Sequence, residues 1–145
     1  MIIWLTGQPG AGKTTIAKEI LRIENSSDWF HIDGDDIREL FDNKDYSEQG
    51  RRKNIELAQQ IAFYLHKKGK NIVVSLVSPY KDQRDDFKLK VGDHIIEAYI
   101  HTNEIRGREN FFVKNYEPPT EWFVSVCTDK DTVENCAKYI LSYLI

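Results

Sequence analysis

The sequence contains few cysteines and no long apolar run. Its 145 residues include two cysteines, Cys127 and Cys136, which are too few for a disulfide framework and lack the spacing of a metal site. No apolar stretch approaches the roughly 18 residues that a membrane-spanning helix needs, and the first residues do not form a signal peptide. We therefore expect reduced thiols, no membrane association and a cytoplasmic location.

An excess of positive charge is also absent. Twenty Lys and Arg residues oppose 23 Asp and Glu residues, so the formal net charge is −3. This balance argues against a nucleic-acid coat or a polybasic membrane binder, although it allows a local basic site. A hydrophobic fraction of 41% and 145 residues are typical of one globular domain. We expect a single domain over residues 1–145, and we do not expect nucleic acid as a partner.

Apolar runs alternate with segments of helical periodicity along the chain. Strands are expected over residues 2–5, 29–32, 72–77, 94–101 and 122–127. Helices are expected over residues 13–24, 36–41, 51–68, 80–90 and 131–144, the third of them ending at a glycine cap, Gly69. The segment 103–112 has no clear pattern, and 116–120 contains two prolines that predict irregular structure. The alternation predicts an α/β fold with a five-stranded, parallel, doubly wound sheet, helices on both faces and a ligand at the carboxyl ends of the strands.

The first expected turn has the signature of a phosphate-binding loop. Residues 7–14, GQPGAGKT, match G-x-x-x-x-G-K-[ST] between a strand and a helix. In such a loop the backbone N–H groups bind phosphate oxygens, the lysine reaches the β- and γ-phosphates, and the hydroxyl holds Mg²⁺. The glycine spacing does not fit the dinucleotide motif G-x-G-x-x-G. We therefore expect ATP and Mg²⁺, with the nucleotide bound by Gly7, Gly10, Ala11, Gly12, Lys13, Thr14 and Thr15.

A second polar segment, Asp33-Gly34-Asp35-Asp36-Ile37-Arg38, follows the second expected strand. At the same edge of the sheet, Asp35 could accept a hydroxyl proton during attack on the γ-phosphate, or it could bind Mg²⁺ through water. Arg38, one helical turn later, would pair with an anionic acceptor. The alternative interpretation is an N-cap aspartate with a surface arginine. The third strand lacks the carboxylate that many NTPases carry there, so metal binding would depend on Thr14, the phosphates and water, aided by Asp33 or Asp35.

These segments in this order resemble the adenylyl-sulfate kinase family. The resemblance rests on the phosphate loop, on Asp33-Gly34-Asp35-x-x-Arg38, on Tyr46-Ser47 followed by Arg51 and Asn54, on SLVSPY at residues 75–80 and, more weakly, on YEPP at residues 116–119. The family has the P-loop kinase fold. It transfers the γ-phosphoryl group of ATP to the 3′-hydroxyl of adenylyl sulfate, with Mg²⁺. Its members often form homodimers, so a homodimer is a further expectation.

The resemblance implies a role for each matched residue. Asp35 would activate the acceptor hydroxyl, with Lys13 and Arg38 as the other catalytic residues. Arg38, Arg51 and Asn54 would bind the phosphate and sulfate side of the acceptor, while Thr14 and Asp33 would serve the metal. Tyr46 stands where the family has a phenylalanine that stacks on the acceptor adenine. Ser78 falls on the family's active-site serine and would contact the acceptor.

The chain departs from the family after the fourth expected strand. The family's Arg-Asp-Pro-Lys-Gly-Leu-Tyr segment and basic lid helix are absent, which places a deletion between Arg108 and Phe111. Arg106 and Arg108 could still supply lid cations, and Phe111 or Phe112 could cap a base in the acceptor site. The alternative is a surface helix with solvated arginines and buried phenylalanines.

The shortened lid leaves the acceptor open. Adenylyl sulfate is the leading candidate. The alternatives are cytidine diphosphoramidate, another nucleotide or a polynucleotide end. A protein that binds nucleotide without catalysis is a further alternative, although the phosphate loop and Asp35 together favour an enzyme.

Overall fold

Five parallel strands form the centre of the computed structural model, which describes residues 1–144. The strands are β1 (Ile2–Thr6), β2 (Trp29–Asp33), β3 (Asn71–Ser75), β4 (Ile95–His101) and β5 (Phe123–Cys127). Their order in the sheet is β2-β3-β1-β4-β5, with β1 paired to β3 and β4. This arrangement confirms the predicted α/β fold with an all-parallel sheet.

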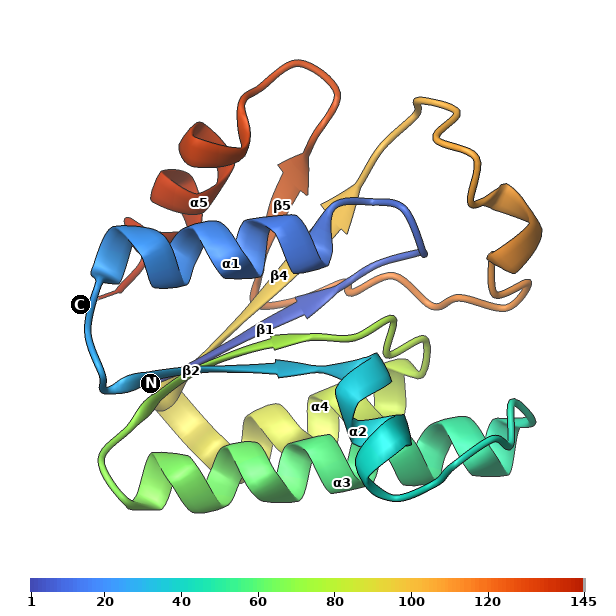
Figure 1. The fold of residues 1–145 in the computed structure, drawn as a ribbon, viewed down its shortest axis with the longest axis horizontal. Coiled ribbons are helices and arrows are strands. Elements are labelled where there is room, and N and C mark those ends of the chain that lie inside the picture. The colour runs from blue at the N-terminus through green and yellow to red at the C-terminus, as the bar shows by residue number, and fades with distance from the viewer. Residues whose placement is uncertain (145) are drawn as a thin grey trace.

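Helices cover both faces of the sheet, as predicted. They are α1 (Lys13–Glu24), α2 (Gly34–Leu40), α3 (Glu48–Lys67), α4 (Lys81–Val91) and α5 (Val133–Leu141), with short 3-10 turns at Gly92–His94 (η1) and Glu109–Phe111 (η2). Figure 1 shows α1 and α5 together on one face and α2, α3 and α4 on the other. The unclear segment 103–112 thus contains one 3-10 turn and no α-helix.

Several element boundaries differ from the prediction: α2 covers residues 34–40 instead of 36–41, α5 ends at Leu141 instead of residue 144, and β3 covers residues 71–75 instead of 72–77. At the starts of α3 and α5 the difference arises because a side chain caps the helix. The Ser47 hydroxyl accepts a hydrogen bond from the backbone N–H of Gly50 at 3.3 Å, so α3 begins at Glu48 instead of residue 51. The Thr132 hydroxyl accepts from the N–H of Asn135, so α5 begins at Val133 instead of residue 131. Both caps satisfy N–H groups that a helix start leaves without partners.

The central strand β1 contributes to two hydrophobic layers. Ile3 and Leu5 belong to the cluster that includes α1 and α5, while Ile2 and Trp4 belong to the cluster that includes α3 and α4. All five residues of β1 are buried, because helices cover the strand on both sides. This explains why β1 reads as a continuous apolar run without polar alternation. Within residues 1–144, no helix combines the length and apolar character required to cross a membrane.

A buried ion pair joins α4 to β4. Arg84 Nε donates to Glu97 Oε1 at 2.7 Å, and the two side chains are 2% and 1% exposed. Lys88 also donates to the Glu97 carboxylate, and the Arg84 guanidinium donates to the carbonyls of Ser78 and Glu117. The network therefore ties the loop after β3 and the proline-containing segment before β5 to the sheet.

Loss of this network is expected to destabilise the fold. Arg84→Ala removes the main partner of a carboxylate that stays buried, which costs about 3–5 kcal/mol in the free energy of unfolding. Urea denaturation measures the change. Arg22→Ala is the control, because Arg22 pairs with Glu19 on the surface of α1, and it should leave the urea midpoint nearly unchanged. Equal losses in the two variants would contradict the prediction.

Candidate functional site

The phosphate loop lies between β1 and α1, pressed against the end of β4. A Cβ atom on Gly7 would lie 2.1 Å from the carbonyl oxygen of Ile100, a distance that no side chain tolerates. Gly12 adopts a φ of 110°, in the left-handed region that favours glycine. Gly7 and Ala11 are buried inside the loop, so their contribution to a ligand site is confined to the backbone. The sequence pattern is thus explained by the close approach of the loop to the sheet.

Lys13 is held within this loop. Its Nζ atom donates to the carbonyl oxygens of Gly7 and Gln8 at 2.8 and 2.9 Å. Burial lowers the pKa of Lys13 to about 8, and the nearby Asp33 carboxylate opposes that shift. The Lys13 amine is therefore desolvated, and an anionic group placed beside it would stabilise its charged form.

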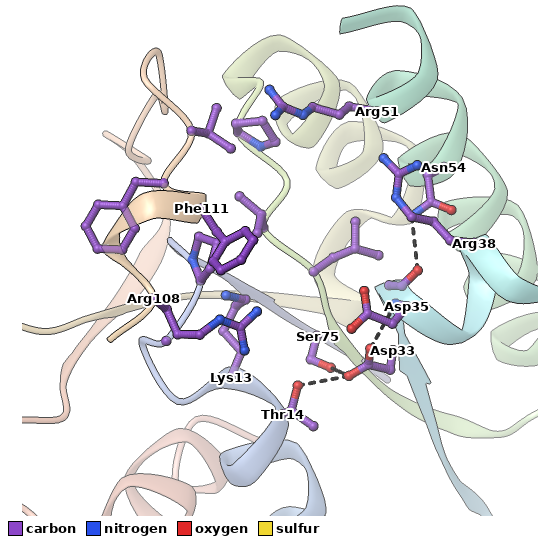
Figure 2. A pocket seen from close by; sticks show the side chains of 18 of the residues that line it. Lys13, Thr14, Asp33, Asp35, Arg38, Arg51, Asn54, Ser75, Arg108 and Phe111 are labelled. Carbon is purple, nitrogen blue, oxygen red and sulfur yellow. Dashed lines mark hydrogen bonds between the residues drawn. The ribbon is translucent and has the colours of Figure 1, made fainter. Parts of the chain in front are cut away.

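Asp33 is the centre of a hydrogen-bond network at the end of β2. Its Oδ2 atom accepts from the hydroxyls of Thr14 and Ser75 at 2.9 and 3.0 Å, and His31 Nε2 lies 2.7 Å from Ser75 Oγ. Burial alone raises the pKa of Asp33, but hydrogen bonds from the Asp35 amide and from these two hydroxyls outweigh it, so the net pKa lies below its ordinary value. Asp33 is therefore held as a carboxylate (Figure 2).

The oxygen atoms of Thr14 and Asp33 suit a magnesium ion. Both are hard donors, and they lie 2.9 Å apart beside the phosphate loop. No cluster of three or more His, Cys, Asp or Glu side chains suited to a metal occurs among residues 1–144. A magnesium ion at this place would therefore take its remaining ligands from phosphate oxygens and water.

Asp33, rather than Asp35, caps α2. The backbone N–H of Asp35 donates to Asp33 Oδ1 at 2.9 Å, which is an N-cap interaction. The N-cap aspartate of the alternative interpretation is therefore Asp33, and the Asp35 side chain takes no part in the cap. The Asp35 side chain is exposed and points into the cleft opposite Lys13 (Figure 2), so its carboxylate is available to a ligand.

Arg38 and Tyr46 form one unit on the same side of the cleft. Arg38 Nη1 donates to the carbonyls of Asn43 and Asp45, each at 3.0 Å, and its guanidinium lies 4.0 Å from the centre of the Tyr46 ring. The Tyr46 ring therefore packs against a cation, although the resemblance implies that it stacks on a base. Both side chains line the cleft.

The first turns of α3 bring Arg51 and Asn54 to the cleft (Figure 2). Asn54 is 4% exposed and its Nδ2 donates to the carbonyl of Gly34 at 3.2 Å. Its Oδ1 atom is buried and has no hydrogen-bond partner among the described residues. Such an atom is an unused acceptor at the edge of a ligand site.

Ser78 lies outside the cleft, unlike the position that the resemblance implies. The side chain is 1% exposed, and its hydroxyl accepts a hydrogen bond from Trp4 Nε1 at 2.9 Å. A buried indole N–H requires such a partner. In this structure Ser78 therefore provides the hydrogen-bond partner of a buried tryptophan.

The short segment after β4 forms the opposite wall of the cleft. Arg106 donates to the carbonyls of Gly10 and Ala11 and to the Thr128 hydroxyl, at distances of 3.3, 3.1 and 2.9 Å. Arg108 also lines the cleft. Phe111 and Phe112 are 66% and 42% exposed, so the alternative with buried phenylalanines is wrong.

One cleft of about 890 Å³ brings these parts together. Its lining includes five cationic side chains, Lys13, Arg38, Arg51, Arg106 and Arg108, and two carboxylates, Asp33 and Asp35. The cleft thus carries positive charge in a chain whose formal net charge is −3. It suits an anionic ligand.

The sequence did not point to every residue of this site. Ser75 and His31 support the Asp33 carboxylate. Ser75 begins the SLVSPY segment of the resemblance, which implies no role for it, and His31 matches no motif. Gln8 stands at a variable position of the phosphate-loop pattern, and its partner Val113 is 105 residues away.

Comparison with known proteins agrees with this geometry. The sequence profile of the family described as adenylylsulphate kinase matches residues 1–110. The adenylyl-sulfate kinase of Pseudomonas aeruginosa is 33% identical over 165 aligned positions, which span 99% of this chain and 84% of that protein. The chain belongs to the adenylyl-sulfate kinase family.

The family relatives also support a shortened lid. The alignment with the Pseudomonas aeruginosa enzyme is longer than this chain of 145 residues, so that relative has additional residues within the aligned span. The match to the family profile ends at residue 110, within the segment where the sequence predicts the deletion.

Solved structures share the fold. The structure of the Mycobacterium tuberculosis APS kinase CysC in complex with AMPPNP and APS superposes with a TM-score of 0.81 at 19% identity, over 97% of this chain and 95% of that one. A gluconokinase from Sinorhizobium meliloti has a TM-score of 0.67 at 15% identity, over 97% of this chain and 89% of that one. At these identities the likeness concerns the fold alone.

Nucleotide binding is expected to take up protons near pH 8. Because the pKa of Lys13 is about 8, roughly half of the Lys13 amines are neutral at that pH. Phosphate groups raise this pKa, so binding should take up about half a proton at pH 8 and less toward pH 6, where the amine is already charged.

Titration calorimetry with ADP in buffers of different ionisation enthalpy measures this uptake. Lys18→Met, which alters an exposed lysine of α1, should leave it unchanged. A binding heat that is independent of the buffer at pH 8 would contradict the low pKa of Lys13.

Proposed function

We propose that this protein is an ATP-dependent kinase that transfers the γ-phosphoryl group to the 3′-hydroxyl of adenylyl sulfate. The observation that carries the proposal is one cationic cleft in which the phosphate loop faces Asp35 and Arg38. A phosphate-binding loop alone is compatible with many NTPases. A carboxylate and an arginine opposite that loop provide what a phosphoryl acceptor with both a hydroxyl and an anionic group requires.

The donor side would bind ATP through the loop backbone and Lys13. The N–H groups of the loop and of the first turn of α1 favour phosphate oxygens, and burial of the Lys13 amine, which lowers its pKa to about 8, favours an anionic phosphate as its partner. Thr14 and Asp33 would hold Mg²⁺, which supplies charge neutralisation at the phosphates when bound. Ser75 and His31 keep the Asp33 carboxylate in position.

On the acceptor side, Asp35 would be the general base. It would take the proton of the acceptor hydroxyl while the hydroxyl oxygen forms a bond to the γ-phosphorus. The bond between that phosphorus and the oxygen bridging to the β-phosphate would break, and ADP would leave with the electron pair. The exposed Asp35 carboxylate suits this step because only the backbone N–H of Asp35 takes part in the cap of α2, which leaves the side chain unused there.

The acceptor anion would be bound by Arg38 and Arg51. Carbonyl groups of Asn43 and Asp45 already orient the Arg38 guanidinium, so little side-chain freedom is lost on binding. The Asn54 Oδ1 atom, which lacks a partner in the described structure, would accept a hydrogen bond from a hydroxyl or amino group of the acceptor. Tyr46, Phe111 and Phe112 provide exposed aromatic surface for a base.

A different nucleotide-linked anion is the second candidate acceptor. The observation that favours it is the shortened lid. The lid forms the acceptor-side wall of the cleft, and in this chain Phe111 and Phe112 of that wall remain exposed. The phosphoryl-transfer residues are the same in both cases. Cytidine diphosphoramidate and polynucleotide ends are therefore included in the test below.

The decisive experiment is a transfer assay with a panel of acceptors. Purified protein, radiolabelled ATP and Mg²⁺ are incubated with adenylyl sulfate, cytidine diphosphoramidate, a set of nucleotides and a DNA 5′ end. We expect the highest kcat/KM with adenylyl sulfate, and Lys13→Ala should abolish transfer because it removes the amine from the phosphate loop. No transfer to adenylyl sulfate at high protein concentration would reject this acceptor.

Asp35→Asn should keep nucleotide affinity while it reduces transfer about 10²–10⁴-fold, the range of a lost general base. Steady-state kinetics and an ATP-analogue titration separate the two effects. Asp36→Asn is the matched control, because Asp36 is an exposed neighbour on α2 that does not line the cleft, and it should retain activity. An Asp35→Asn variant with full activity would refute the assignment of the base.

A further inference from the structure

Gln8 joins the phosphate loop to the lid through two hydrogen bonds with one peptide unit. Its Nε2 atom donates to the carbonyl oxygen of Val113 at 2.8 Å, and its Oε1 atom accepts from the N–H of Val113 at 2.9 Å. The side-chain amide thus pairs with the N–H and C=O groups of Val113 in the way that a neighbouring β-strand would. Two bonds in opposite directions define both the distance and the orientation of the partners.

Residues 106–113, which we name the lid segment, are attached to the phosphate loop at both ends. Gln8 holds one end at Val113, and Arg106 holds the other at the carbonyls of Gly10 and Ala11. Between these ends the backbone approaches closely, because a Cβ atom on Gly10 would lie 3.0 Å from Arg108 Cβ. The lid segment therefore lies directly against the loop that would bind phosphates.

Beyond its two ends, the lid segment makes local hydrogen bonds among the described residues, for example from the backbone N–H groups of residues 106–108 to the Glu109 carboxylate. Its regular structure is limited to the single 3-10 turn η2, and Phe111 and Phe112 are largely outside the core. Segments with little buried apolar surface open locally at low free-energy cost. The next anchor along the chain is Tyr116, whose hydroxyl lies 2.8 Å from Thr6 Oγ1, so the two bonds of Gln8 are the hydrogen bonds that hold Val113 itself.

Gln8 itself does not line the cleft, whereas Arg108, Phe111 and Val113 do. Any effect of Gln8 on the reaction therefore acts through the wall that the lid segment forms. The loop on which Gln8 stands forms the donor side of the same cleft. The Gln8 side chain thus connects the phosphate loop, on the ATP side of the cleft, to the lid segment, which forms the wall on the side of the phosphoryl acceptor.

We propose that Gln8 is a positioning residue that fixes the lid segment on the phosphate loop and so closes the acceptor side of the cleft. Its role in acceptor binding rests on the proposed function, whereas its hold on the lid segment does not. Without Gln8, the Val113 end of the segment opens more often. Acceptor binding weakens, and water enters the cleft more easily.

The first test is hydrogen exchange in the ligand-free protein. Gln8→Leu removes both bonds and keeps a side chain of similar size. We expect exchange at the Val113 amide and its neighbours to accelerate roughly 5- to 100-fold, as expected for two lost hydrogen bonds. Gln60→Leu is the matched control, because Gln60 bonds to Glu56 on the exposed surface of α3, and it should not affect the lid segment.

Gln8→Glu provides a test that a general packing defect would not mimic. An ionised carboxylate repels the Val113 carbonyl, but a protonated carboxyl group can donate to that carbonyl and still accept from the N–H. Protection of Val113, corrected for intrinsic exchange, should therefore return as the pH falls through about 4–5, where a glutamate side chain gains its proton. Gln8→Leu should show no such return.

The second test uses the acceptor that the panel identifies. Gln8→Leu should raise the KM for that acceptor about 5- to 100-fold and leave the affinity for an ATP analogue within about twofold of that of the native protein. A selective loss of Val113 protection supports the attachment of the lid segment even if no acceptor in the panel reacts. Absence of transfer to every acceptor in the panel would reject the proposed function, but it would not contradict the attachment of the lid segment by Gln8.

Two results would overturn the inference. If Val113 protection in Gln8→Leu equals that of the native protein, or falls equally in Gln60→Leu, Gln8 does not hold the lid segment. If protection falls selectively while the acceptor KM stays unchanged, Gln8 has no role in acceptor binding.

Discussion

The position of β1 between β3 and β4 is the constraint on which the site depends. The chain passes from β1 to one side of the sheet and later returns to the other, so the loop after β1 lies at the point where the strand order reverses. The loops after β2, β3 and β4 end at the same edge, because all strands are parallel. The phosphate loop, Asp35 and the lid segment thus meet at one cleft, although Gln8 of the loop and Val113 of the lid segment are 105 residues apart.

Most of the charged groups that are buried against the sheet have partners. The Asp33 carboxylate accepts three hydrogen bonds, and Glu97 is paired with Arg84 and Lys88. Lys13 is the exception, since its amine is buried against carbonyls and its pKa is lowered for that reason. Burial of a cation without a direct ion pair costs stability, and an anionic ligand at the loop would offset that cost.

The sequence allowed accurate prediction wherever the signal was local. The five strands and the main helices follow from apolar periodicity. The phosphate loop follows from glycine positions that the close contact with Ile100 and a left-handed φ require. Helix ends were less predictable because caps such as Ser47 depend on single hydrogen bonds. Ser78 could not be placed, because its burial depends on the indole of Trp4, 74 residues away.

The sequence by itself thus determined the α/β class, from the alternation of strands and helices, and the positions of the phosphate loop and of Asp35 and Arg38 directly after strands β1 and β2. The tertiary structure alone decided which groups act together. It paired Gln8 with Val113, placed Ser75 and His31 behind Asp33, and packed Tyr46 on Arg38. The physical reason is that contacts between side chains of different elements, whether hydrogen bonds or the packing of a cation on a ring, leave no periodic pattern in the chain.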